Sequence, residues 1–166
     1  MLRTAVLSTR GLCSVYRRGR PGVLGVALLV LVMVTPAAAV EAGRIKISRG
    51  TAWLERAGAR LAATVGTVVQ QEDVIITGPD GSVGITMADD SRLSIGPDTT
   101  LAIERFAFNP TTHEGEEEIS LRRGTLAAVS GKLAHQSPEA MKVRTPAAII
   151  GVRGTEFVVR TGEVAQ

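Results

Sequence analysis

Hydrophobic and polar residues alternate with a period of two along much of the chain after residue 40. In the central stretch the apolar positions are odd numbers: Val83, Ile85, Met87, Leu93, Ile95, Leu101 and Ile103. Successive side chains of a β-strand point to opposite faces, so this period is typical of strands with one buried face. The pattern predicts a series of short, half-buried strands.

Turn residues separate these strands. Gly, Pro and Asp gather at residues 78–81, 89–91 and 96–98, where each favours a chain reversal. Short strands at such close spacing are typical of all-β folds. We therefore predict an all-β fold of short antiparallel strands, arranged as a sandwich or as an irregular β-solenoid-like stack.

The rest of the chain fits the same scheme. Further strands are expected at residues 44–48, 51–55, 74–76, 119–121, 126–129 and 155–160. Residues 109–118 and 131–139 lack periodicity and are expected to be polar loops. Alanine-rich pieces at 57–63 and 132–141 are interrupted by Gly58 and Pro138, so no helix is predicted there.

The first 39 residues have the layout of a signal peptide. Arg17, Arg18 and Arg20 precede an apolar run of 13 residues at 22–34, and three alanines follow at 37–39. A helix that crosses a membrane needs about 20 residues. We therefore predict a signal peptide at 1–39, cleavage near Ala39, a domain at 40–166, and a periplasmic or secreted protein. An uncleaved segment that tethers a regulator to the inner membrane is the alternative.

The charge changes along the chain. The whole sequence has 19 basic and 16 acidic residues, but five arginines and no acid lie in the first 39 residues. Residues 40–166 therefore carry 14 basic and 16 acidic residues, with no basic cluster longer than Arg122 and Arg123. A slightly acidic body without a basic patch predicts no nucleic-acid partner.

Candidate chemistry in residues 40–166 is sparse. They contain no Cys and two His, His113 and His135, too few for a zinc site and a poor basis for a nucleophile with its base. Four aspartates stand in predicted turns: Asp80, Asp89, Asp90 and Asp98. Aspartate is common in turns and the spacing is not that of a calcium loop. We expect no enzymatic activity, no metal and no cofactor.

Three other positions have open interpretations. Trp53 is expected in the core, with a surface role in binding a saccharide as the alternative. Phe106 and Phe108 lie two residues apart and are expected on one face at the edge of the core. Arg153 and Glu156 stand in an otherwise apolar segment, so we expect either a paired structural contact or a recognition role.

Several short motifs follow one another in a fixed order and close with Arg-Gly-Thr-Glu-Phe at 153–157. The motif residues that we take as candidate interaction positions are Asp73, Thr77, Gly78, Asp89, Gly96, Pro97, Thr145, Pro146, Arg153, Gly154, Thr155, Glu156 and Phe157. Their order resembles that of the FecR domain over about residues 43 to 160. Asp90 stands where this family commonly has Gly, so a left-handed backbone is expected there.

The resemblance implies an all-β module of bacterial envelopes with no enzymatic activity. Its best-known members relay the occupancy of an outer-membrane siderophore receptor to a cytoplasmic sigma factor. Those transducers have a sigma-binding segment before a spanning helix and a receptor-contacting domain after the module, whereas here 21 residues precede the apolar run and the sequence ends at Gln166. We therefore expect a free-standing exported FecR-domain protein.

The expected function is protein–protein interaction or signal relay in the cell envelope. The partner is expected to be an unidentified envelope protein, with membrane contact only if the signal segment is retained. Few residues follow the strand at 155–160, so its edge is expected to be free for a partner chain. The acidic loop around Glu116 is the other candidate surface, and a periplasmic saccharide- or peptidoglycan-binding module is the alternative function.

Overall fold

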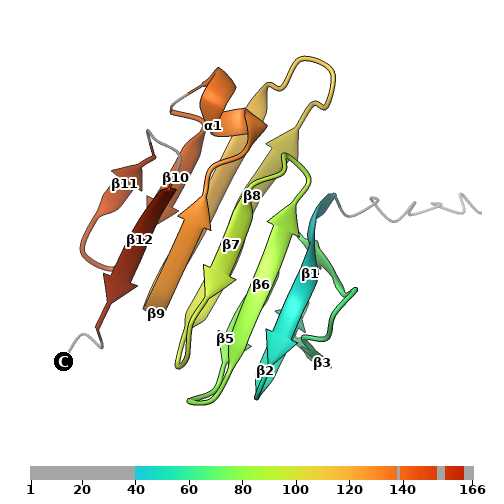
Figure 1. The fold of residues 1–166 in the computed structure, drawn as a ribbon, viewed down its shortest axis with the longest axis vertical. Helices are drawn as coiled ribbons and strands as arrows, with labels where there is room; N and C mark the ends of the chain where they lie inside the picture. Colours follow the sequence, from blue (N-terminus) through green and yellow to red (C-terminus); the bar gives the residue numbers. More distant parts are fainter. Residues whose placement is uncertain (1–39, 138, 153–155, 163–166) are drawn as a thin grey trace, which may run out of the picture. The chain divides into compact units, whose positions relative to one another are not determined.

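Twelve strands and one short helix make up the described part of the chain. The structure is a computed structural model and describes residues 40–137, 139–152 and 156–162. In chain order (Figure 1) the elements are β1 (Glu41–Arg49), β2 (Ala52–Arg56), β3 (Ala59–Ala62), β4 (Val68–Gln70), β5 (Val74–Thr77), β6 (Ser82–Met87), β7 (Arg92–Ile95), β8 (Thr100–Phe108), β9 (Gly115–Val129), α1 (Lys132–Gln136), β10 (Met141–Arg144), β11 (Ile149–Gly151) and β12 (Glu156–Thr161). The prediction of an all-β fold is confirmed.

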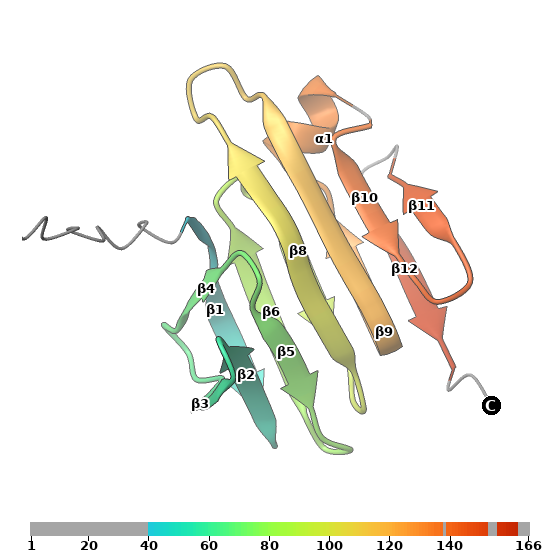
Figure 2. The ribbon, with the colours of Figure 1, turned by 180° about the vertical axis from the view of Figure 1, so that it is seen from behind.

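The strands form one curled sheet with two facing layers. Its path runs β3-β2-β5-β8-β9-β7-β6-β1-β4, with β10, β11 and β12 branching from β9. The view from behind shows β8 and β5 in the near layer, with β6 behind them (Figure 2). The curled arrangement is a half-barrel, so the two layers enclose a core between them.

Strand β9 belongs to both layers. Its first part pairs with β8 and β10, and its last part, from Gly124 to Val129, pairs with β7 and β12. The bend between the two parts lies at a register shift opposite Thr100 and Leu101, followed by Gly124 with φ +98°. An extra residue in one strand and a left-handed glycine both turn a strand sharply, which explains how one strand serves two layers.

The core includes all the odd-numbered apolar positions predicted from the sequence between Val83 and Ile103. In β6 and β7 every second side chain is buried, as the alternation requires. The largest fully buried side chains are Phe106, Ile45, Leu54, Ile75, Ile85, Leu93, Ile95, Leu101, Ile103, Ile119, Leu121 and Leu126. Phe106 is in the core, while Phe108 is half-buried and stacks on His113, as expected for the edge of the core.

Two predictions of local structure are wrong. Residues 109–118 are a loop only as far as residue 114, because Gly115 to Glu118 already belong to β9, which joins the strands predicted at 119–121 and 126–129 into one. Residues 131–139 are not only loop, since α1 occupies five of them. The acidic residues at 116–118 continue the alternation of buried and exposed positions in β9. Their high charge made this segment look like a loop in the sequence.

Four short strands were not predicted. β3, β4, β10 and β11 have three or four residues each, too few to show a period. Pairing with longer neighbours holds them in place, and β10 pairs with β9 in parallel, an exception to the predicted antiparallel order. Tertiary pairing, not local preference, decides such strands.

The predicted signal peptide at 1–39 lies outside the described residues. Within the described ranges, no helix has the length and apolar character needed to cross a membrane.

Candidate functional site

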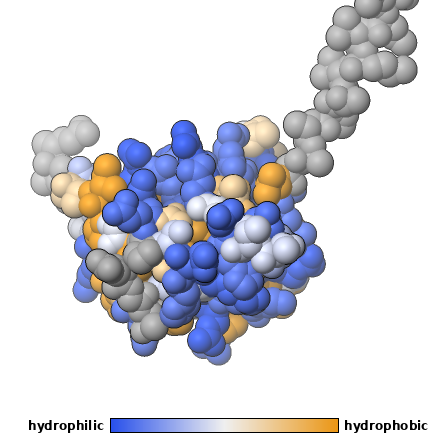
Figure 3. Space-filling model, turned by 90° about the horizontal axis from the view of Figure 1, so that it is seen from above, coloured by the Kyte–Doolittle hydropathy of each residue, from blue (hydrophilic) through white to orange (hydrophobic). Residues whose placement is uncertain are grey.

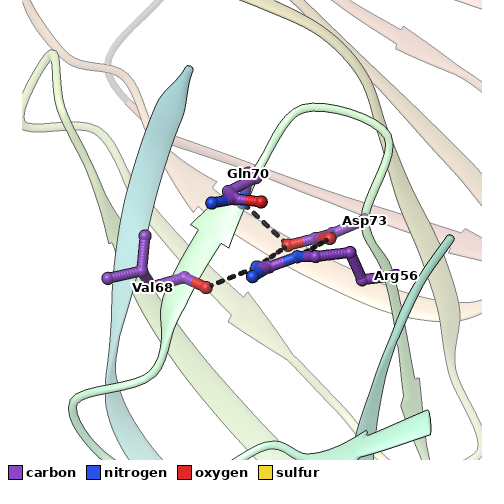
Figure 4. Close-up of polar contacts among 4 residues, drawn as sticks. All are labelled: Arg56, Val68, Gln70 and Asp73. Atoms are coloured by element: carbon purple, nitrogen blue, oxygen red, sulfur yellow. Dashed lines mark hydrogen bonds and ion pairs between the residues drawn. The ribbon is translucent and has the colours of Figure 1, made fainter. Parts of the chain in front are cut away.

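Asp73 is the buried centre of a polar cluster that lies between β2, β4 and β5 (Figure 4). Its carboxylate accepts two hydrogen bonds from Arg56, from Nε at 2.8 Å and from Nη2 at 2.7 Å, and a third from the backbone N–H of Gln70 at 2.7 Å. Arg56 also donates to the carbonyl of Val68 at 2.8 Å. The hydrogen bond to Asp73 raises the pKa of Arg56, so Arg56 stays positively charged. The cluster ties β2, β4 and the start of β5 together.

Thr77, Gly78, Gly96 and Pro97 form a second cluster, at the turns after β5 and β7. The hydroxyl of Thr77 donates to the carbonyl of Gly96 at 2.7 Å and accepts from the N–H of Thr99 at 2.9 Å. The carbonyl of Gly78 accepts from the N–H groups of Gly81 and Asp98. These bonds satisfy backbone groups of tight turns, which is a structural role.

Asp89 joins the turn after β6 to the helix α1. Its Oδ1 accepts from the N–H of Ser91 at 3.0 Å, and its Oδ2 and carbonyl accept from the N–H groups of Leu133 and Lys132 at 3.4 and 2.8 Å. Asp90 beside it has φ +69°, in the left-handed region that Asp tolerates better than most residues. Asp89 is buried, and it orients α1 by accepting the first N–H groups of the helix.

Glu117 is a buried carboxyl group that the sequence analysis missed. It lies on β9, directly opposite Phe106 of β8 and Met141 of β10, and neither of its oxygens has a hydrogen-bond partner within the described structure. Burial, with a smaller contribution from the negative charge of Asp89, raises the pKa of Glu117 from an ordinary 4.5 to about 8. Its position in the odd-numbered series before Ile119 and Leu121 is the signal that would have placed it inside.

The remaining motif residues lie near the C-terminal end of the domain. The hydroxyl of Thr145 closes the turn between β10 and β11 by bonding to the N–H and carbonyl of Ala148, with Pro146 exposed in that turn. Glu156 and Phe157 begin β12. Arg153, Gly154 and Thr155 lie outside the described residues, and so does the expected pairing of Arg153 with Glu156.

The motif residues therefore do not converge on one pocket within the described structure. They occupy separate clusters, and most of them hold turns. The feature that a partner could contact directly is the open end of the sheet, where β11 and β12 are the last strands of their layers.

Strand β12 is the longest free edge of the sheet. It pairs with β9 on one side and, among the described residues, has no strand on the other. Its burial alternates: Glu156, Val158 and Arg160 face solvent, while Phe157 and Val159 are half-buried against the core. Val158 is 66 % exposed, and Ile149 on β11 is 61 % exposed. Hydrophobic surface is visible at this side of the molecule, the left side in Figure 3.

Comparison with known families decides the identity of the fold. The model of the family described as FecR protein matches residues 73–165, which is more than half of the chain. The chain belongs to the FecR protein family. No curated protein and no solved structure matches it. FecR proteins are in general non-enzymatic signalling regulators that work with partner proteins.

The residues matched to the FecR family run from β5 to β12 and include the open edge. The strands β1 to β4 precede the matched segment, yet they complete both layers, because β2 pairs with β5 and β1 pairs with β6. Asp73, the first matched residue, is held by Arg56 from the preceding part. The strands before the matched segment therefore belong to the same folded unit as the matched strands.

The predicted turn aspartates have protein partners in the FecR domain. The side chain of Thr51 and its N–H, which donates to Asp80, lower the pKa of Asp80. Asp90 forms an ion pair with Lys132, which lowers the pKa of Asp90. Across the ranges that the structure describes, no three His, Cys, Asp or Glu side chains gather as metal ligands would. These contacts account for the aspartates as turn residues.

Trp53 is half-buried on β2. The guanidinium group of Arg60 lies over its ring at 5.3 Å from the ring centre, and Arg60 is itself paired with Glu55. A sugar that stacked on this face would have to displace Arg60. The arrangement stabilises the β2–β3 hairpin by a cation–π contact.

Proposed function

We propose that this FecR protein is an exported, non-catalytic module that works by contact with another protein in the bacterial cell envelope. The observation that carries the proposal is the free edge of β12. An edge strand has a row of unpaired N–H and C=O groups, which are a template for one more strand from a partner. The protein is periplasmic or secreted in this proposal, with the signal peptide removed near Ala39.

The side chains of β12 support contact at this edge. Phe157 and Val159 point toward the core but stay half-exposed, since nothing among the described residues covers them from the open side. An added strand would bury these side chains together with Val158. Burial of apolar surface is worth about 25 cal/mol per Å², so the edge can contribute to binding as well as to register.

The non-catalytic role is supported by what the motif residues do. Asp73, Thr77 and Asp89 are buried and their polar atoms are occupied by hydrogen bonds that hold turns. Side chains used in this way stabilise the frame that presents β12. This agrees with the general character of the FecR family.

The location is tested by cell fractionation with N-terminal sequencing of the recovered chain. We expect a chain that begins at Val40 in the periplasmic or secreted fraction. A chain that begins at Met1 and fractionates with membranes would overturn export by cleavage and favour the tethered regulator.

The contact is tested by affinity capture from envelope extracts. We expect a stoichiometric protein, either a different chain or an untagged copy of this one, to be retained by the wild type and lost with Val158→Asp. The matched control is Val65→Asp, because Val65 is 64 % exposed against 66 % for Val158 and lies between β3 and β4, at the far end of the sheet. Equal retention by both variants, or capture of nothing, would contradict the proposal.

A further inference from the structure

The outward face of β12 has a charge order that is complementary to itself. Glu156, Val158 and Arg160 alternate along the strand with Phe157 and Val159 facing inward. We infer that β12 pairs antiparallel with β12 of a second copy of this chain, with Val158 on the two-fold axis. This inference rests on the proposed function, because it names the partner that the free edge takes.

The register follows from the position of the axis. In an antiparallel pair centred on Val158, Glu156 of each copy lies opposite Arg160 of the other, and Phe157 lies opposite Val159. Both charge pairs are therefore of opposite sign, and the two valines meet at the centre. A parallel pair would instead align Glu156 with Glu156 and Arg160 with Arg160, which is unfavourable.

The two charges have no ion-pair partner within the described chain. On β9 their direct neighbours are uncharged, since Glu156 lies opposite Val129 and Arg160 opposite Thr125. The next charge in the row of Glu156 is Arg92 on β7, two strands away. A second β12 would bring a positive charge into the position adjacent to Glu156 and a negative one next to Arg160.

The inward face is complementary as well. Phe157 and Val159 both pack against the core and are both half-buried. Cross-strand aromatic and β-branched pairs are among the favourable ones in sheets, so two Phe157–Val159 pairs would extend the core of each copy into the other. The interface is isologous and closes with two copies.

The other strands at the ends of the sheet do not offer this combination. β4 and β11 have three residues each, too short for a self-complementary pattern of this length. β3 has four, and its one charge, Arg60, is engaged by Glu55 and lies over Trp53. Charged residues on an edge often serve to prevent pairing. Here their opposite signs, at equal distances from Val158, favour one specific pairing.

The test is a charge exchange measured on the purified full chain as exported, by sedimentation equilibrium over a range of concentrations. We expect the wild type to dimerise. R160E and E156R each place like charges opposite one another twice, and each should weaken the dimer by about ten-fold or more. The double variant E156R/R160E restores opposite charges and should return the dissociation constant to within about three-fold of the wild type.

The control variant is K46E, which makes the same change of charge on an exposed residue of β1 and should leave dimerisation unchanged. Trp53 fluorescence should be the same in all variants, because Glu156 and Arg160 are exposed. A wild type that is monomeric at all concentrations would overturn the inference. So would a dimer that the double variant fails to restore.

A second measurement tests the axis directly. Residues 40–166 contain no cysteine, so in the exported chain V158C supplies the one thiol and should form a disulfide between copies under mild oxidation. V65C, at a site of nearly equal exposure, should not. If the wild type does not dimerise, the proposed contact with a different envelope protein through Val158 is still tested by the affinity capture described above. Failure of both would overturn the proposed function too.

Discussion

At the scale of single residues, the buried carboxyl groups of Asp73 and Glu117 differ in whether they have hydrogen-bond partners. Asp73 has Arg56 and a backbone N–H as partners, whereas Glu117 is buried without a hydrogen-bond partner among the described residues. Burying a carboxylate without a partner costs free energy, so the protonated form of Glu117 is favoured. This preference raises its pKa to about 8. The two groups therefore respond differently to pH and to mutation.

Glu117→Gln should remove a pH dependence of stability. The pKa of Glu117 rises from 4.5 to about 8 on folding, so the folded state holds more protons between these values and its stability falls as the pH rises through them. The slope approaches about 1.4 kcal/mol per pH unit. Gln has the same shape and cannot ionise, so the variant should be more stable than the wild type at pH 8 and similar at pH 4.5.

Urea unfolding at a series of pH values measures this effect. The conservative comparison is Glu104→Gln, since Glu104 is exposed and its change should leave the slope almost unaltered. An unchanged slope in Glu117→Gln would show that Glu117 is charged in the folded protein.

Arg56→Met should destabilise the protein by about 3 kcal/mol, because it leaves the buried carboxylate of Asp73 without its cation. The control is Arg122→Met, because Arg122 is exposed and its pair with Glu104, at 4.0 Å, is worth at most about 1 kcal/mol. Chemical unfolding of the two variants gives both values. A similar small loss in both would mean that water reaches Asp73.

The sequence allowed some of these residues to be predicted and concealed others. Asp90 could be placed in a left-handed turn because Asp tolerates that conformation where Gly is usual. Glu117 was assigned to a polar loop because four of the residues at 114–118 are acidic. The acidic composition suggested that Glu117 is exposed to solvent. The period of two, continued backward from Ile119, would have placed its side chain in the core. The partner of Asp73 is 17 residues away in the chain, and no local pattern could identify it.

At the scale of elements, the bend of β9 is the feature on which both layers depend. The register shift near Arg122 and Arg123 leaves both side chains exposed, and Gly124 follows with φ +98°. A Cβ at Gly124 would collide with Thr99, whose hydroxyl accepts from the N–H of Thr125. The sequence predicted two strands here because the bend interrupts the alternation.

Gly124→Ala should therefore destabilise the protein by about 2 kcal/mol or more, through backbone strain and the contact with Thr99. Gly151→Ala in β11 is the matched control, since nothing lies within 4 Å of a Cβ there. Thermal unfolding followed by circular dichroism distinguishes them. A Gly124→Ala variant as stable as Gly151→Ala would mean that the bend tolerates an L side chain.

At the scale of the whole molecule, sharing β9 joins the two layers into one cooperative unit. β9 is the strand through which the two layers are paired, because β8 and β10 pair with its first part and β7 and β12 with its last. A small domain in which one strand joins both layers should unfold in a single transition.

Two probes can show this single transition. Trp53 on β2 is the only tryptophan and reports on the layer of β2, β5 and β8, while far-UV circular dichroism averages over all strands. We expect the two urea transitions to coincide. A Trp53 transition at a lower urea concentration would show that its layer unfolds independently.

The position of β9 in the chain also sets an order of events during synthesis. Residues 40–108 hold eight strands, but β8 has no second neighbour and β7 is unpaired on one side until residues 115–129 are present. A chain that emerges with its amino end first must therefore wait for about 90 residues beyond the predicted signal peptide before either layer can close, and such distant pairing is slow. The nascent chain consequently stays open, with its strand edges accessible to chaperones, until a late stage of its synthesis.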